Sequence, residues 1–573
     1  MKEMSRFNPR KKDLIQLALV FAIIIVVNLI SSNWFFRIDL TAEKRYTLAP
    51  VTRDYLRNLD HQVLVRVYLH GDLNVGFQRL ARTTRETLDE FRLVSRGAIQ
   101  YEFVDPATDA NIREELREWG LSPVPVYEAE ADGRRTQTNV FPYAIFHIDG
   151  YELPVNLLEN LPGKSGAENL NISMESLEYK ITDAMRRLAT DEIPAVAFLE
   201  GHGELDEWDV YDITEALSHY YQVDRGALTG DPWVLDNYEA IIIAKPQERF
   251  SESDKFIIDQ YIMRGGKVLW LVDAVNVTLD SLRRATQTVG LATDVNLSDQ
   301  LFRYGVRINH ELLQDIQAAM IPINTAPDGQ QPRFVPVPWL FNPLLNVNME
   351  HPVTRNLNAV RGEFVSSIDT VGSPEDIYRE VLLHTSRFTR RLPVPVYISL
   401  AMVNERPERE DFRSSYVPVA VAMEGSFPSV FANRLIPPGI EMEASEVRHR
   451  SEPTRMIVVA DGDIIKNEVR NRHGASPRAM PLGFDEMGNQ TFGNKQFILN
   501  AINYLVDDEG WMELRTRNYE LRLLDREKLS SQIKFWQTIN VLVPLLFLLL
   551  IGVTLPVWRK FTFGKHKGVD EAV

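Results

Sequence analysis

The sequence predicts an α/β protein in which two domains lie between two membrane-spanning helices. Three observations predict this class: an apolar run near each end of the 573 residues, alternating strand and helix patterns at 44–190, and apolar strands without polar alternation at 194–510. Strands that are apolar on both faces indicate a parallel sheet covered by helices. A chain of this length also exceeds one ordinary domain.

The composition is that of a folded protein that does not bind nucleic acid. Apolar residues make up 45% of the chain and charged residues 25%, so large cores can form and general disorder is disfavoured. The formal net charge is −16, whereas a phosphate backbone requires a concentrated Lys/Arg face. The chain has no cysteine, which excludes disulfides, thiolate zinc sites and cysteine nucleophiles.

The N-terminal end predicts a cytoplasmic basic tail at residues 1–13 and a first transmembrane helix at 14–36. The apolar run at 14–30 is at the lower length limit for a span, and three aromatic residues follow it as an interfacial belt. A cleaved signal peptide is the competing interpretation. Residues 28–36, NLISSNWFF, offer no small-x-small cleavage site, which favours an uncleaved anchor.

The C-terminal end predicts a second transmembrane helix at 535–558, between a juxtamembrane segment at 511–534 and a cytoplasmic tail at 559–573. Its apolar stretch INVLVPLLFLLLIGVTLPV is bracketed by Trp536 and Trp558 and followed by basic residues. A buried core helix is the alternative, but it fits poorly with so apolar a run before a basic tail. Two spans place both termini on one side, and the basic N-terminal tail places that side in the cytoplasm.

In this topology the residues between the spans lie outside the cytoplasmic membrane. Asn28 and Asn540 then fall near the outer ends of the two spans. We expect either that they form hydrogen bonds within or between molecules, or that they simply sit as polar residues at the interface. The second interpretation is the simpler one.

Residues 44–190 show the order β-α-β-α-β-β-α, which predicts a thioredoxin-like domain. A β-rich run at 63–69 precedes a helical pattern at 77–94. An antiparallel pair is predicted to turn at residues 149–150, and a helix at 172–189 closes the unit. Because no cysteine is present, the domain has no redox dithiol, and we interpret it as a binding or spacer domain.

Residues 194–510 predict a parallel sheet covered by helices on both faces, because apolar strands such as AVAFLE, YEAIIIAKP, KVLWLVDAV and RMIVVADGD alternate with helical patterns. In such sheets ligands bind outside the carboxyl ends of the strands. The residues at those ends form the candidate crevice for a ligand or partner: Gly201, His202, Gly203, Glu204, Lys245, Asp273, Asp461 and Asp463.

The crevice residues complete no catalytic or metal-binding motif. The serine elbow Gly-x-Ser-x-Gly and the zinc motif His-Glu-x-x-His are both absent, and Asp461-Gly-Asp463 lacks the other ligands of a calcium loop. His202 has neither a nucleophile nor an orienting partner in the sequence pattern, which favours a structural role over a catalytic one. The sequence therefore predicts no catalytic residue, no metal site and no cofactor.

A proline-rich segment at 321–343 carries six prolines together with Trp339 and Phe341. We expect an ordered loop over the crevice or a partner surface, or else a connecting loop. The spacing of the prolines does not decide between these interpretations.

Several motifs occur in a fixed order along the second half of the chain: GHGE after a strand, AKPQERFSESDKFIIDQYIMRGGKVLWLVD, LFRYGVRINHELLQD, AVAMEGSFPSVFANR and MIVVADGDIIKNEV. Together they resemble the gliding-motility ABC-transporter auxiliary family, specifically its GldG branch. The segment NYELRLLDREKLSSQIKFWQTINVLVPLLF and the second span resemble the same family. The resemblance therefore covers nearly the whole chain.

This resemblance implies a non-catalytic, inner-membrane auxiliary subunit of an ABC transporter complex, with a periplasmic body, in gliding bacteria of the Bacteroidetes type. The implied partners are an ABC permease, a cytoplasmic ABC ATPase, membrane lipid and other cell-envelope or motility proteins. The implied role is to bind a substrate or an envelope partner. The domain at 194–510 is implied to resemble class I glutamine amidotransferases, without their cysteine nucleophile and hence without their activity.

Two alternatives remain open at this stage. One is a periplasmic hydrolase that acts on a polysaccharide or peptidoglycan through His202 and Glu204. The other is a purely structural assembly platform with no small ligand.

Overall fold

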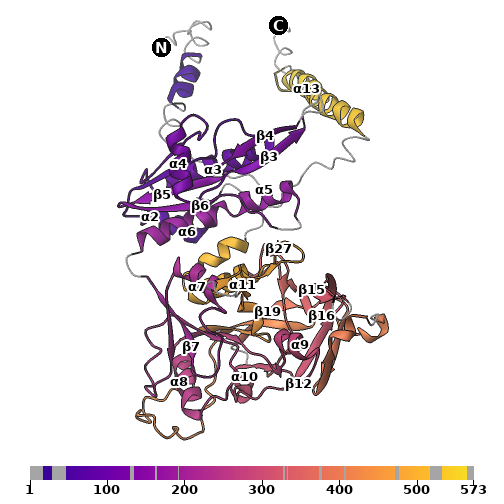
Figure 1. Cartoon of the computed structure of the whole chain (residues 1–573). Helices are drawn as coiled ribbons and strands as arrows, with labels where there is room; N and C mark the ends of the chain where they lie inside the picture. The colour runs from indigo at the N-terminus through magenta and orange to yellow at the C-terminus, as the bar shows by residue number, and fades with distance from the viewer. Residues whose placement is uncertain are drawn as a thin grey trace, which may run out of the picture. The chain divides into compact units, whose positions relative to one another are not determined.

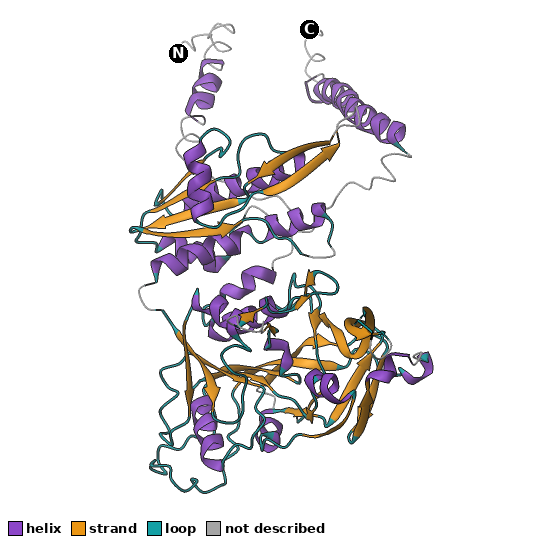
Figure 2. Ribbon diagram, in the orientation of Figure 1, coloured by secondary structure: helices purple, strands orange, loops and turns teal. Residues whose placement is uncertain are grey.

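The computed structural model describes residues 17–26, 28, 47–129, 135–161, 164–190, 193–326, 330–331, 333–372, 377–404, 408–470, 477–516 and 532–563. Within them the chain is a mixed α/β protein (Figure 2), which confirms the predicted class at that level. Met1–Asn518 and Tyr519–Val573 form separate compact units.

The first part of the body contains a four-stranded sheet in the order β2-β1-β5-β6. Its strands are β1 (Val63–Val67), β2 (Ile99–Phe103), β5 (Tyr143–Ile148) and β6 (Tyr151–Asn156). β1 and β2 are parallel, whereas β5 is antiparallel to both β1 and β6. The predicted turn between β5 and β6 is confirmed. Asp149 and Gly150 both adopt positive φ angles, which glycine, asparagine and aspartate tolerate better than other residues.

Five helices and one hairpin accompany this sheet: α2 (Pro50–Arg57), α3 (Val75–Val94), α4 (Ala110–Glu118), α5 (Gly166–Glu175), α6 (Leu177–Ala189) and β3 (Val124–Ala129) with β4 (Arg135–Val140). The predicted single helix at 172–189 is wrong, because the chain breaks at Ser176 into α5 and α6. α5 begins earlier than predicted because Ser165 and Glu168 form a capping box at its start.

The second part contains a ten-stranded sheet in the order β15-β16-β19-β22-β23-β10-β9-β7-β8, with β17 paired to β16. In that order the strands are Ala318–Asn324, Phe334–Val347, Ile377–His384, Pro418–Gly425, Thr454–Val459, Lys267–Leu271, Ala240–Ala244, Ala195–Glu200 and Gln222–Ala227, and β17 is Val360–Arg361. Figure 1 labels several of them.

The prediction of a parallel sheet holds for only half of these strands. β8, β7, β9, β10 and β23 are parallel, whereas β22, β19, β16 and β15 continue the sheet antiparallel. The sequence could not reveal the change of direction, because β22 is buried on both faces like its parallel neighbours.

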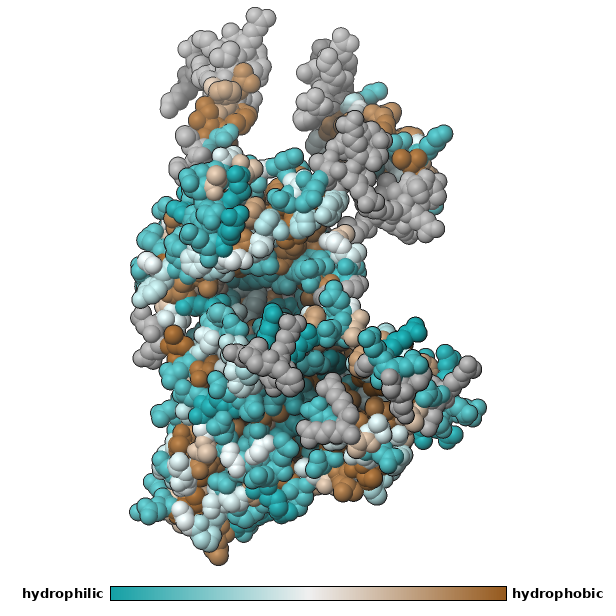
Figure 3. Space-filling view, in the orientation of Figure 1, coloured by the Kyte–Doolittle hydropathy of each residue, from teal (hydrophilic) through white to brown (hydrophobic). Residues whose placement is uncertain are grey.

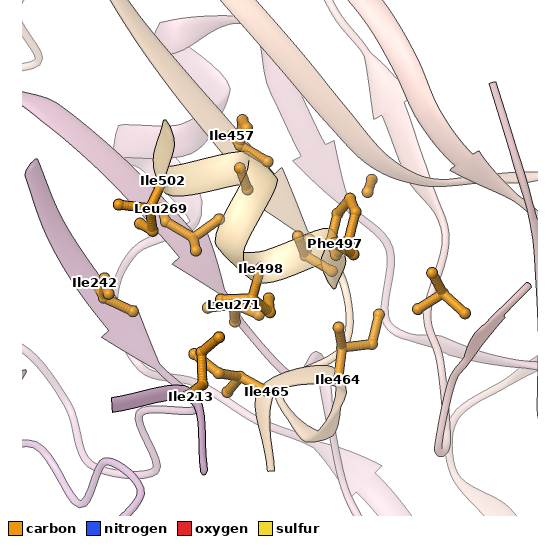
Figure 4. Close-up of a cluster of buried hydrophobic side chains, with 14 of the residues drawn as sticks. Ile213, Ile242, Leu269, Leu271, Ile457, Ile464, Ile465, Phe497, Ile498 and Ile502 are labelled. Carbon is orange, nitrogen blue, oxygen red and sulfur yellow. The ribbon is translucent and has the colours of Figure 1, made fainter. Parts of the chain in front are cut away.

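Helices cover both faces of the parallel half: α7 (Tyr211–Ser218) and α11 (Asn494–Val506) pack in one hydrophobic cluster, and α8 (Glu252–Met263) and α10 (Ser298–Tyr304) in another. Successive residues of the central strands alternate between the clusters: Ile242 and Leu269 belong to the first, Ile243 and Trp270 to the second. Figure 4 shows the first cluster, where Phe497 and Ile498 of α11 lie among strand residues.

Smaller elements extend the body. They are α9 (Leu279–Ala285), β11 (Val275–Asn276), β12 (Gln287–Ala292), β13 (Val306–Ile308), β14 (Glu311–Asp315), β18 (Ile368–Thr370), β20 (Thr389–Pro393), β21 (Val396–Ser399), β24 (Val469–Arg470), β25 (Arg478–Ala479), β26 (Phe484–Asp485), β27 (Gln490–Thr491), η1 (Leu400–Asn404), η2 (Arg409–Asp411), η3 (Asp463–Ile465) and η4 (Trp511–Thr516).

The prediction of a loop at 321–343 is wrong, because this segment supplies most of the antiparallel pair β15–β16. Pro336 and Pro338 occupy exposed alternate positions of β16, whereas Trp339 and Phe341 are buried. The Val-Pro-Val-Pro run is therefore a period-two strand pattern, with the prolines placed where the sheet tolerates them.

One helix among the described residues is long and apolar enough to cross a membrane. It is α13 (Ile533–Phe563), whose apolar stretch is Ile533–Trp558 and which includes Asn540; Figure 3 shows apolar side chains on it. Near the other end, Leu17–Val26 is a shorter apolar helix and Asn28 is helical. The predicted tail at 559–573 begins too early, because α13 continues to Phe563. The rest of that tail, the tail at 1–13, the remainder of the predicted span at 14–36 and residues 517–531 of the predicted juxtamembrane segment lie outside the described residues.

Candidate functional site

The candidate crevice lies at a point where the connections of the sheet diverge. From β7 the chain crosses to β8 on one side and then to β9 on the other, so the carboxyl ends of β7 and β9 form a topological switch point. Residues 201–204 follow β7 and Lys245 follows β9. Asp273 follows the adjacent β10, and Asp461 and Asp463 follow β23. The structure thus brings all the predicted crevice residues to neighbouring strand ends.

The Gly-His-Gly-Glu turn is closed against the loop that follows β9. The carbonyl oxygen of His202 accepts hydrogen bonds from the backbone N–H groups of Gln247 at 2.9 Å and Glu248 at 2.8 Å, and Leu205 donates its N–H to Ala244 at 3.0 Å. The turn is therefore a fixed part of the sheet edge.

His202 is held by two carboxylates. Its Nδ1 lies 3.2 Å from Glu204 Oε1 and its Nε2 lies 3.2 Å from Asp254 Oδ2, in the first turn of α8. Its ring stacks on Phe250 with a centroid distance of 3.7 Å. Burial alone lowers the pKa of His202, but the bonds to Glu204 and Asp254 outweigh burial and raise it. Both ring nitrogens are therefore engaged, and the arrangement is that of a cationic tie between the turn and α8.

A raised histidine pKa stabilises the fold most at low pH. The stabilisation is complete below the ordinary pKa of 6.5 and is lost as pH rises through the higher folded value. We expect His202→Gln to lower the free energy of unfolding more at pH 6 than at pH 9, measured by urea unfolding of the detergent-solubilised chain. The exposed His449, changed in the same way, serves as control. An equal loss for His202→Gln at both pH values would contradict the charged tie.

The other four crevice side chains form one buried charged cluster. Lys245 Nζ contacts Asp463 and lies 3.1 Å from Asp273 Oδ2. Asp273 Oδ1 accepts the backbone N–H of Gly462 at 2.5 Å, and Asp461 Oδ1 accepts that of Asp463 at 2.8 Å. Lys245 is 5% exposed and Asp461 is fully buried. The cluster thus ties together the ends of β9, β10 and β23.

The sequence did not reveal a fourth carboxyl group, that of Glu363. Its backbone N–H donates to Asp461 Oδ2 at 2.9 Å, and its Oε1 accepts the N–H of Leu279 at 3.4 Å. Burial raises the pKa of Asp273, Asp461 and Glu363, the last to about 7. Asp254 and Glu363 were missed because each reaches the crevice from a segment distant in sequence, and no local pattern marks such a contact.

Burial alone would lower the pKa of Lys245. The carboxylates of Asp273 and Asp463 raise it above its ordinary value instead, so the ammonium group stays charged. One oxygen from each of Asp273, Asp461 and Asp463 lies within 4.8 Å of the others, a grouping that could hold a metal ion. Lys245 already contacts two of these three carboxylates. The cluster therefore carries its own cation, and we assign no metal to it.

Gly462 is required for the close approach of two strand ends. A Cβ atom at this position would lie 2.5 Å from Lys245 Cβ and 3.0 Å from Lys245 Cα. We expect Gly462→Ala to lower the free energy of unfolding by about 1–3 kcal/mol through overpacking. Gly226→Ala in β8 is the control, because no atom lies within 4 Å of its added Cβ. Equal denaturation midpoints for Gly462→Ala and the unmodified chain would refute the packing argument.

Comparison with solved structures finds remote likenesses. One is described as mmIFT52 N-terminal domain, with 10% identity, a TM-score of 0.30, and coverage of 57% of this chain and 100% of that one. Another is the exo-β-1,4-mannosidase Op5Man5 from Opitutaceae bacterium strain TAV5, with 11% identity, a TM-score of 0.18, and coverage of 68% and 46%. Scores this low carry no functional meaning.

Two sequence families match the chain, and no curated protein does. Residues 42–147 match a domain of unknown function, DUF7088. Residues 194–501, more than half of the chain, match the family described as ABC-type uncharacterized transport system. The match contains the whole crevice and the parallel half of the sheet, and it agrees with the motifs noted in the sequence. The chain therefore belongs to the auxiliary family of ABC-type transport systems.

Proposed function

We propose that this protein is a non-catalytic, membrane-anchored auxiliary subunit of an ABC transporter complex. The observation that carries the proposal is the family match over residues 194–501 in a chain that also contains the apolar helix α13. α13 would anchor the body beside a permease, and a separate cytoplasmic ATPase would supply energy.

The finer assignments are part of this proposal. The sheet order β2-β1-β5-β6 supports a thioredoxin-like first domain, and the parallel strands with helices on both faces support an amidotransferase-like second domain. The short apolar helix Leu17–Val26 supports a first span in addition to α13. We propose an inner-membrane protein with both termini in the cytoplasm, a periplasmic body and a role in gliding motility.

The geometry of the crevice favours a non-enzymatic role over the hydrolase alternative. Both ring nitrogens of His202 face carboxylates, and Lys245 is bonded to Asp273 and Asp463. A general base needs a lone pair directed at its substrate, and the His202 ring has both nitrogens committed. We propose that the crevice acts as a rigid edge against which a ligand or envelope partner docks. Full function of a His202→Gln, Glu204→Gln variant in the assembled complex would eliminate the hydrolase.

The experiment that tests the proposal is affinity purification of the full chain from its native membrane in mild detergent. We expect a multi-span permease and an ABC ATPase to be recovered with it in fixed ratio. An unrelated inner-membrane protein of similar abundance, carrying the same affinity tag, is the control. Recovery of the chain without either subunit, under conditions in which both are present in the membrane, would contradict the proposal.

A further inference from the structure

A cavity of about 320 Å³ lies in the β-rich part of the body and shares no lining residue with the crevice. Its volume is within the range of small-ligand sites. β14, β16, β20, β21, η1 and η2 all contribute residues to its wall. The apolar part of the lining consists chiefly of Trp339, Phe341, Leu392, Val396, Met402 and Phe412.

Two polar side chains in this wall lack hydrogen-bond partners among the described residues. Gln314 is 7% exposed and lines the cavity, yet its side-chain amide forms no hydrogen bond there. Trp339 is 2% exposed; its Nε1 has no partner in the described part of the chain but is fully buried, so Trp339 contributes only apolar surface to the wall. The adjacent Asp315, by contrast, accepts hydrogen bonds from Ser386 and Thr389. The amide of Gln314 is not among the fully buried unpaired atoms, so it remains accessible from the cavity. An unpaired amide in an otherwise apolar wall is a natural anchor for a polar ligand group.

Charged side chains of both signs complete the lining. Arg390 Nη1 lies 3.8 Å from Asp411 Oδ2, and both side chains are about half exposed. Glu408 is exposed and adds a second carboxylate. The cavity therefore offers an apolar wall, an unpaired amide, and cationic and anionic groups that remain accessible to water.

We propose that this cavity binds a peptide segment bearing a large apolar side chain. A glutamine amide both donates and accepts, which matches the C=O and N–H of a peptide group. The apolar wall receives the side chain, and the charged groups contact the flanking residues or termini. This inference goes beyond the transporter role and does not rest on it.

A peptide group with an apolar side chain can come from a free short peptide or from a segment of a partner protein. The accessible charges of Arg390, Asp411 and Glu408 would pair with the charged termini of a free peptide. An internal segment has no such termini. The two sources can therefore be separated by ligands with free and with blocked ends.

The test uses the full chain in lipid nanodiscs and ligand-observed saturation-transfer NMR, with empty nanodiscs as background. The probes are N-acetyl-phenylalaninamide, which mimics an internal segment, and phenylalanyl-phenylalanine with free termini. N-acetylglycinamide, which has peptide groups but no apolar side chain, is the negative probe. We expect saturation of at least one phenylalanine probe and none of the glycine probe, and the stronger phenylalanine probe identifies the source.

Two variants locate the binding. Gln314→Leu keeps the side-chain volume and removes the amide, so we expect at least about a tenfold weaker affinity, the effect of one lost hydrogen bond. Val403→Trp fills the cavity and should abolish the signal. Gln222→Leu, the same substitution on the exposed part of β8, should leave it unchanged.

The proposal is overturned if neither phenylalanine probe saturates, or if the glycine probe saturates equally. It is also overturned if both cavity variants bind as tightly as the unmodified chain. Thermal unfolding of each variant shows whether it is folded. Gln314→Leu removes a polar group from the wall, whereas Val403→Trp adds volume to it. If one of the two variants does not fold, the binding measured for the other still tests the proposal.

Discussion

Replacing Lys245 with methionine is expected to lower the free energy of unfolding by about 3–5 kcal/mol at pH 8, the usual cost of breaking a buried ion pair. Methionine has a similar length and no charge, so the carboxyl groups of Asp273, Asp461, Asp463 and Glu363 lose the ammonium group that lies among them. The measurement is urea unfolding of the full chain in detergent.

The pH dependence of this deficit follows from the raised carboxyl pKa values. Without the Lys245 ammonium group, the carboxyl pKa values of the folded cluster rise further above those of the unfolded chain. The stability of the variant therefore falls as pH rises. We expect the deficit to be smaller at pH 5 than at pH 8. Lys466→Met, which removes a partly exposed pair with Asp209 at 3.6 Å, should cost less than about 1 kcal/mol. Similar losses of stability for Lys245→Met and Lys466→Met would contradict a special dependence of the carboxyl cluster on the Lys245 ammonium group.

Replacing Glu363 with glutamine is expected to raise the free energy of unfolding, in contrast to the Lys245 substitution. The pKa of Glu363 rises from an ordinary 4.5 to about 7 in the folded chain, so its ionisation opposes folding above pH 7. At about 1.36 kcal/mol per pKa unit, the gain from Glu363→Gln at pH 8 is roughly 3 kcal/mol. Glutamine retains an oxygen that can accept the N–H of Leu279.

The gain should vanish at pH 4, where the carboxyl group is protonated in both states. It should develop between pH 4.5 and 7, the interval between the ordinary and the folded pKa. Glu248→Gln, at an exposed position in the loop after β9, serves as control and should change stability by less than about 0.5 kcal/mol. A destabilised Glu363→Gln variant at pH 8 would show that this carboxyl group is needed in its charged form.

Residue patterns were sufficient to predict the parallel half of the sheet and the meeting of its strand ends. Apolar strands such as β9 and β10, each followed within two residues by a charged residue, bring Lys245 and Asp273 together once the strands are parallel. The antiparallel half could not be predicted. β22 is buried on both faces, so it lacks the apolar-polar alternation that is typical of antiparallel strands with one exposed face.

The partners of the crevice residues were also beyond prediction. Asp254 looks like an ordinary first-turn residue whose backbone N–H donates to the N-cap side chain of Ser251, yet its carboxylate also bonds His202. Glu363 sits between two short strands, and only the tertiary fold brings its backbone to Asp461. Contacts between residues so distant in sequence depend on the chain path, which one sequence does not specify.

The absence of cysteine makes a direct test of the central claim possible, because any introduced cysteine is the only thiol in the chain. We would place one at Phe547, 65% exposed on α13, and a control at Tyr416, 57% exposed on the body. Each variant is labelled in native membranes with a thiol-directed photo-crosslinker, and the adducts are identified by mass spectrometry. An auxiliary subunit anchored beside its transporter predicts that Phe547→Cys crosslinks to an ABC permease and that Tyr416→Cys does not. Adducts of Phe547→Cys with lipid or its own copies alone, in membranes that contain the permease, would contradict the account.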